Sequence, residues 1–265
     1  MARTAITSAR TAIASARTAI ATRRPVVRDF PYSIRLSGAS SYFNIPNANA
    51  LEDLFVGGSS FITWFKAEAS SAAVVFPIYS PTSSVQGWWL QFDSGGTYPV
   101  NRVRFGSAYT ASNRLYKTPL LSLPYNRWIC AQVSYNASTP ETVPIITLNG
   151  VNQTITASGT GTEYLTDDTK AWRSSNGAAN TNLVVGGEMR WIKGKQMTLT
   201  EMQDYYYDNT IPVGGTLLAH YKFADGAGAS VTDASGNGNT MSLNGTYEWL
   251  ANEGPEMGKL RTVIS

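Results

Sequence analysis

From residue 33 onward, short apolar segments recur along the chain with turn-forming residues between them. Most alternate apolar and polar positions, which is the pattern of a strand with one buried face. Glycine, asparagine and proline separate them at short intervals, as in hairpin connections. At least eleven segments are predicted to be strands: SIRLSG, SYFNIP, FITWFKAE, VVFPIYS, GWWLQFD, NRVRFGS, RWICAQVSYN, VPIITLNG, NLVVGG, LLAHYKF and MSLNGTYEW. This pattern predicts an all-β sandwich or barrel in one domain.

One segment departs from this alternation and predicts a short surface helix near residues 199–208. Its apolar side chains recur at helical spacing: Leu199, Met202, Tyr205 and Tyr206. Thr198 with Glu201, or Thr200 with Gln203, has the spacing of a capping box, which would start the helix.

The opening of the chain follows a third pattern. ARTAITS, ARTAIAS and ARTAIAT repeat every seven residues from Ala2 to Thr22. On a helix the isoleucines and alanines form only a narrow coiled-coil seam, with fewer than four heptads and helix-weakening threonines. On a strand an odd period places successive isoleucines on opposite faces. Two interpretations follow: a solvated low-complexity tail, or an arm, helical or extended, that becomes ordered only against other subunits or a larger assembly.

In the second interpretation, the repeated arginines and isoleucines are the assembly residues: Arg3, Ile6, Arg10, Ile13, Arg17 and Ile20. Pro25 and Pro31 bracket the linker that joins this arm to the body. The predicted organisation is an arm and linker at 1–32, a sandwich domain at 33–250 and a tail at 251–265.

Composition agrees with many strands and turns. Only 15% of the 265 residues are charged, whereas 11% are aromatic and 23 are glycine. Much of the net charge of +3 comes from arginines in the first 28 residues, so the body has no basic stripe for nucleic acid, although the arm could contact phosphates. No apolar run approaches the roughly 18 residues of a membrane span, and the N-terminus has no recognisable signal peptide.

Metal and cofactor chemistry has little support in the sequence. Cys130 is the only cysteine, which excludes an internal disulfide and a zinc site with several thiolates. The run DASGNGN at 233–239 is typical of a tight turn, because Asn237-Gly238 favours a hairpin and Asp233 with Ser235 can bond their own backbone. Calcium needs 6 to 8 oxygens, which is more than one hairpin offers. No cofactor is predicted, and calcium binding stays undecided.

Several of these segments also resemble a known family when they are taken in their order along the chain. SIRLSGASSYFNIPN, FITWFKAE, NRWICAQVSYN with ITLNGV, NLVVGG with MTLTEMQDYY, and LLAHYKFADGAGASVTDASGNGNTMSLNG are similar to successive parts of laminin G-like, concanavalin A-like domains. The resemblance implies a concanavalin A-like jelly-roll sandwich of two antiparallel sheets. The stretch between Gly187 and Thr198 is short for the usual strand pair, so an altered edge strand is expected there.

Catalysis is not predicted. His220 lies within an alternating strand, and we interpret it as a histidine in or beside the sandwich, with no neighbouring acid suggested by the sequence. Glycosidases need two carboxylates about 5 to 9 Å apart, which neighbours on one strand face would supply. No such pair of acids appears on a predicted strand.

Binding residues are predicted in two places. In GWWLQFD the alternation places Trp88, Leu90 and Phe92 in the core and the intervening side chains on the other face, where an indole, an amide and a carboxylate suit a sugar ring. The alternative is that this indole lies under the helix or a loop. A long polar loop, TGTEYLTDDTKAWRSSNGAANTN, carries further candidates at the rim of a binding face, unless it is a plain solvated or subunit-contacting loop. The candidate ligand-binding residues are Trp89, Gln91, Asp93, Asp168 and Trp172.

The leading functional prediction is a non-catalytic structural or adhesive protein at a virion or extracellular surface. Its arm would join copies of the chain or a larger particle, and its sandwich would be displayed for binding. This prediction rests on the resemblance to surface-decoration proteins with laminin G-like bodies. The alternative is a soluble lectin that recognises glycans, and glycoside hydrolysis is a remote third.

Overall fold

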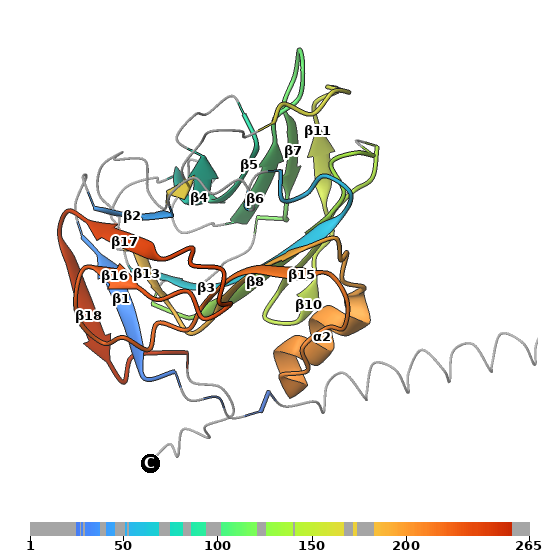
Figure 1. Cartoon of the computed structure of the whole chain (residues 1–265). Helices are drawn as coiled ribbons and strands as arrows, with labels where there is room; N and C mark the ends of the chain where they lie inside the picture. The colour runs from blue at the N-terminus through green and yellow to red at the C-terminus, as the bar shows by residue number, and fades with distance from the viewer. Residues whose placement is uncertain are drawn as a thin grey trace, which may run out of the picture.

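Two antiparallel sheets face each other across an apolar layer in the computed structural model of this chain, and helix α2 (Leu199–Asp208) packs outside them (Figure 1). The predicted all-β jelly-roll sandwich with one short helix near 199–208 is confirmed. The structure describes residues 25, 26, 28, 30–37, 41–45, 51, 53–68, 75–81, 86–93, 102–120, 126–139, 141–166, 172–173 and 183–255.

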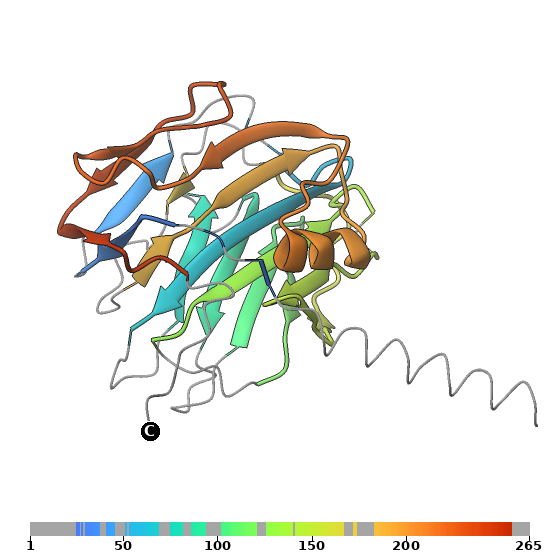
Figure 2. The same cartoon turned by 90° about the horizontal axis from the view of Figure 1, so that it is seen from below.

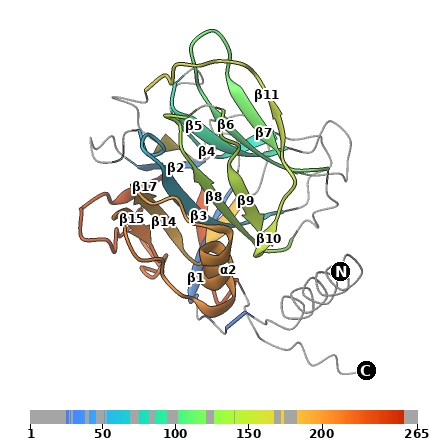
Figure 3. The same cartoon turned by 90° about the vertical axis from the view of Figure 1, so that its right-hand side faces the viewer.

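Within these residues each sheet contains nine strands. The first sheet consists of β1 (Tyr32–Leu36), β3 (Ser59–Ala67), β8 (Ile129–Tyr135), β9 (Ile145–Leu148), β10 (Val151–Asn152), β13 (Leu183–Gly186), β14 (Met189–Lys193), β15 (Thr216–Tyr221) and β18 (Tyr247–Ala251). The second consists of β2 (Tyr42–Ile45), β4 (Val75–Pro81), β5 (Trp88–Asp93), β6 (Arg102–Ser107), β7 (Arg114–Lys117), β11 (Thr156–Ser158), β12 (Trp172–Arg173), β16 (Ser230–Val231) and β17 (Met241–Asn244). Figure 3 shows β5, β6 and β7 above the strands of the first sheet.

The core between the sheets follows from strand alternation. Trp88, Leu90 and Phe92 are at most 2% exposed and belong to this core, as predicted. Trp88 packs against Trp172 at 4.6 Å and against Trp191 at 5.7 Å between ring centroids. Buried aromatic rings of this size contribute much of the apolar area that stabilises a sandwich.

Strands β13 and β14 lie end to end along β3. Leu183 pairs with Ala67 and Lys193 with Ser59, at opposite ends of β3. On its other side β14 pairs with β15, so β14 is an inner strand. The altered edge strand expected here is therefore wrong: one short strand passes through this stretch with a partner on each side. The break between β13 and β14 falls at Gly187, whose φ of +69° favours glycine.

Helix α2 covers the outer face of the first sheet (Figure 2). Its buried side chains Met202 and Tyr205 join Ile62, Trp64 and Cys130 in a second apolar cluster. The helix begins with the first of the two predicted capping boxes: Glu201 N donates to the Thr198 hydroxyl at 3.3 Å, and Thr198 N donates to the Glu201 carboxylate at 2.8 Å.

The loop between β16 and β17 confirms the turn interpretation of residues 233–239. The Asp233 carboxylate accepts hydrogen bonds from the backbone of His220, Ser235 and Asn239, each at 2.9 Å. Gly236 and Gly238 have φ of +86° and +76°. Asp233 therefore organises the loop and ties it to β15. Elsewhere in the fold, none of the described helices has the length and apolar character to cross a membrane.

Candidate functional site

The candidate site lies on the outer face of the first sheet, where the break after Gly187 places Glu188. Arg190 is two residues further along and therefore on the same face of the strand. The register of β14 and β15 sets His220 directly opposite Arg190. Tyr205 reaches the same place from α2. The result is a cluster of polar side chains between the sheet and the helix.

Glu188 is the centre of this cluster. Its Oε1 atom accepts hydrogen bonds from His220 Nε2 at 2.6 Å and from Arg190 Nη2 at 2.5 Å. Its Oε2 atom accepts the hydroxyl of Tyr205 at 2.6 Å. The Glu188 residue is only 7% exposed. A buried carboxylate requires such compensation, because losing water costs several kcal/mol per ion.

The three donors also determine the protonation state of Glu188. Burial alone would raise the pKa of its carboxyl, but the His220 hydrogen bond, the Arg190 charge and the Tyr205 hydroxyl outweigh burial and hold that pKa well below its usual range. Burial, followed by the neighbouring Glu188 charge, raises the pKa of Tyr205 well above its usual value. Glu188 is thus an ionised acceptor and Tyr205 a neutral donor.

Arg28 enters the same region from the segment that precedes β1. Its Nη2 atom donates to the backbone carbonyls of Tyr205 and Tyr206 in the last turns of α2, where the helix dipole favours a cation. Its guanidinium also lies 4.5 Å from the centroid of the Tyr205 ring. Val26 N donates to Tyr207 O at 2.7 Å. These contacts fix the described part of residues 25–31 against the helix.

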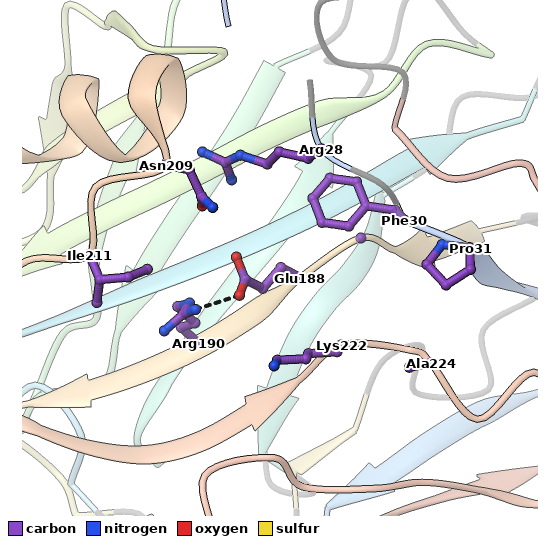
Figure 4. Close-up of a pocket in the computed structure, with 10 residues that line it drawn as sticks. Arg28, Phe30, Pro31, Glu188, Arg190, Asn209, Ile211, Lys222 and Ala224 are labelled. Atoms are coloured by element: carbon purple, nitrogen blue, oxygen red, sulfur yellow. Dashed lines mark hydrogen bonds and ion pairs between the residues drawn. The ribbon is translucent and has the colours of Figure 1, made fainter. Parts of the chain in front are cut away.

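A cavity of about 500 Å³ opens beside this cluster (Figure 4). That volume lies within the roughly 300–1,000 Å³ typical of small-molecule sites. Four parts of the chain contribute its walls: Arg28, Phe30 and Pro31 before β1; Gly187, Glu188 and Arg190 at the start of β14; Asn209 and Ile211 after α2; and Lys222 and Ala224 after β15. The lining combines an aromatic ring, an amide, cations and one carboxylate, which is the mixture that a polar ring-shaped ligand needs.

The structure confirms His220 as a buried histidine on a strand of the sandwich, but it corrects the expectation that no acid lies beside it. Glu188, just before the neighbouring strand β14, lies 2.6 Å from the ring. The Glu188 carboxylate accepts three hydrogen bonds and stays ionised, so it is suited to orienting the side chains around it and to neutralising the Arg190 charge. In the adjacent apolar cluster, burial raises the pKa of the Cys130 thiol, which makes that thiol a poor nucleophile. Among the described residues no group of three or more histidine, cysteine or acidic side chains is placed to hold a metal ion.

The residues predicted on β5 lie on the opposite side of the molecule, on the outer face of the second sheet. Trp89 is 7% exposed, and its indole lies over Gly106 on β6. Gln91 is half-buried in the same strand. Asp93 ends β5, where its backbone pairs with Arg102. Trp89 and Gln91 share one face of the strand, but the Trp89 indole packs against Gly106 of its own sheet.

The other predicted residues are not brought to this face. Trp172 was expected in a loop, but it forms the short strand β12 and is 1% exposed in the core between the sheets. Asp168 lies outside the described residues. The predicted assembly residues of the arm also lie outside them: Arg3, Ile6, Arg10, Ile13, Arg17 and Ile20.

Comparison with known proteins supports the fold. No protein-family model matches the sequence, and no curated protein matches it. The structure is similar to a candidate carbohydrate-binding protein from Bacteroides ovatus, with 13% identity and a TM-score of 0.54 over 83% of this chain and 60% of that chain. It is also similar to a botulinum neurotoxin type C structure concerned with the binding of two gangliosides, and to the serotype C1 binding domain. Their identities are 14% and 12%, with TM-scores of 0.41 and 0.42 over 58% of this chain.

The chain spans 60% of the length of the Bacteroides ovatus protein and less than two fifths of the two neurotoxin chains. At this level of identity the similarity shows the fold alone, a jelly-roll β-sandwich. The more specific resemblance to laminin G-like domains stays a prediction from the sequence.

Proposed function

We propose that this chain is a non-catalytic glycan-binding module whose binding site is the cavity on the outer face of the first sheet. The observation that carries the proposal is the composition of that cavity. Phe30 offers a ring on which a sugar can stack, and the Asn209 amide and Lys222 ammonium offer hydrogen bonds to its hydroxyls. The sandwich shared with a candidate carbohydrate-binding protein agrees with this function.

Position favours a binding role over a purely structural one for this cavity. Lys222 and Ala224 are exposed at its rim, whereas Glu188 and Arg190 are buried at its base. A ligand could therefore enter from solvent and meet side chains whose rotamers are already fixed by the hydrogen bonds to Glu188. Such preorganisation lowers the entropy cost of binding.

A glycan array with the full-length protein, followed by titration of the best ligand, tests the proposal. Ala224→Trp places an indole in the cavity and is expected to lower affinity at least about tenfold, which corresponds to a lost contact of roughly 1.4 kcal/mol. Ala157→Trp, at an exposed position of β11 in the second sheet, is the matched control and should bind as the wild type does.

Three results would contradict the proposal. If no glycan on the array binds, the proposed function is wrong. If the protein releases sugar from a polysaccharide, it is not a non-catalytic module. Glycan binding that survives Ala224→Trp but disappears in Trp89→Ala moves the site to the second sheet, where the sequence predicted it. The assembly role of residues 1–24 and the surface location remain proposals from the sequence, because the described residues do not include the arm.

A further inference from the structure

We infer that the cavity recognises an acidic sugar, one that carries a carboxylate such as a uronic or sialic acid; this inference rests on the proposed glycan-binding function. Three positively charged side chains line the cavity, Arg28, Arg190 and Lys222, against the single carboxylate of Glu188. The described lining residues therefore carry an excess of positive charge, which favours an anionic ligand. A neutral sugar would leave that excess of positive charge unused.

The two arginines have donors that the protein itself does not use. Arg28 and Arg190 are 7% and 8% exposed. The Nε and Nη1 atoms of Arg28 and the Nε atom of Arg190 are buried without a hydrogen-bond acceptor among the described residues. A buried donor without an acceptor is costly, and a buried cation needs compensation by a negative charge. Among the described lining residues Glu188 is the single carboxylate for both guanidinium groups, so an anionic group in the ligand would compensate the remaining charge.

The Glu188 carboxylate favours a singly charged ligand group. In Figure 4 its oxygens lie between the Arg28 and Arg190 side chains at the base of the site. Because this carboxylate stays ionised, it repels a second negative charge, and a phosphate dianion would be repelled most strongly. A planar carboxylate can accept two parallel hydrogen bonds from a guanidinium group while adding only one negative charge.

The remaining lining accounts for the sugar ring that carries the carboxylate. The Phe30 side chain is half-buried, with its ring 5.9 Å from Trp64 between centroids. Asn209 is fixed as the C-cap residue that follows α2, with φ of +57°. A ring contact on one side and an amide on the other would orient a pyranose so that its acid group faces the arginines.

Matched pairs of ligands test the inference by isothermal titration. The pairs are trigalacturonate with its fully methyl-esterified form, and sialyllactose with lactose; sulfated lactose and inorganic phosphate serve as other anions. At least one carboxylated form should bind about tenfold more tightly than its neutral partner, as expected when a charge-assisted hydrogen bond is lost. Lys222→Gln should reduce the ratio of carboxylated to neutral affinity about threefold, because it removes one of the positive charges that line the cavity.

Lys117→Gln, on β7 of the second sheet, is the matched control and should keep the full preference. Equal binding of neutral and carboxylated forms overturns the inference while glycan binding stands. Preference for sulfated lactose, or binding of phosphate alone, overturns the choice of a carboxylate. A carboxylate preference that Lys222→Gln leaves intact but Lys117→Gln abolishes moves the acidic-sugar site to the second sheet. Binding of no sugar on the array overturns both the inference and the proposed function.

Discussion

The outer faces of the two sheets differ in what covers them. On the first sheet, helix α2 and the segment before β1 lie over Glu188 and its partners, and a cavity remains where the covering segments meet the strands. On the second sheet, the Trp89 indole lies directly on Gly106, with little of its surface exposed. An outward position on a strand therefore does not by itself leave a tryptophan ring exposed for binding.

The largest expected effect concerns the covered face. Glu188→Ala removes the acceptor of Arg190, His220 and Tyr205 and leaves a buried guanidinium uncompensated, so the free energy of unfolding should fall by about 3–5 kcal/mol. Urea unfolding followed by tryptophan fluorescence measures it. The control Glu253→Ala removes a half-exposed carboxylate that pairs with Lys66 at 3.5 Å, which should cost at most about 1 kcal/mol. Equal decreases in the free energy of unfolding of the two variants would show that the Glu188 cluster stabilises the fold no more than an exposed ion pair does.

The second sheet should respond to a change at Gly106. A Cβ atom at residue 106 would come within 2.1 Å of the Trp89 ring, so Gly106→Ala must displace the indole and should cost about 1–3 kcal/mol. The displaced indole should also emit at longer wavelength because more of it meets water. In a Trp89→Ala background the same substitution should cost much less, and the double-mutant cycle measures this coupling. Additive losses would contradict the packing of Trp89 on Gly106.

Local patterns in the sequence predicted the strands and the helix but not the cavity. Alternation predicted the core positions Trp88, Leu90 and Phe92, and the capping box predicted the start of α2, because both signals lie within one element. The walls of the cavity come from separate segments, and only the folded topology brings them together. The glycine pair before Glu188 was the available signal of a strand break, but nothing local connects it with Arg28 or His220.

Trp172 illustrates the opposite difficulty. Its polar neighbours predicted a solvated loop, yet it forms a two-residue strand between β2 and β4 and packs in the core. A strand of two residues has no measurable alternation, so its buried side chain cannot be distinguished from an exposed one by pattern. For such residues the pairing of distant strands decides the environment.

The stability of the protein in acid is expected to distinguish the contributions of the two faces. The pKa of Glu188 is lowered on folding, so its contribution to stability is present above the unfolded pKa of about 4.3 and is lost as pH falls toward the folded value. Below pH 4 the contribution of Glu188 to the slope of unfolding free energy should approach about 1.4 kcal/mol per pH unit. Glu188→Gln should reduce the pH dependence of the free energy of unfolding below pH 4. Gly106→Ala should lower the free energy of unfolding by the same amount at every pH. A wild-type slope retained by Glu188→Gln would assign the acid sensitivity to other carboxylates.

The smallest effect on stability is expected from the arm. Deletion of residues 1–24 leaves Val26 bonded to Tyr207 and Arg28 bonded to the end of α2, so the free energy of unfolding should change by less than about 0.5 kcal/mol. Deletion of residues 1–31 removes those contacts too and should destabilise the body clearly. If the heptad repeat mediates assembly, sedimentation should show a larger species for the full chain and a monomer for the shorter deletion. The same sedimentation profile for the full chain and the shorter deletion would leave the repeat as a solvated tail.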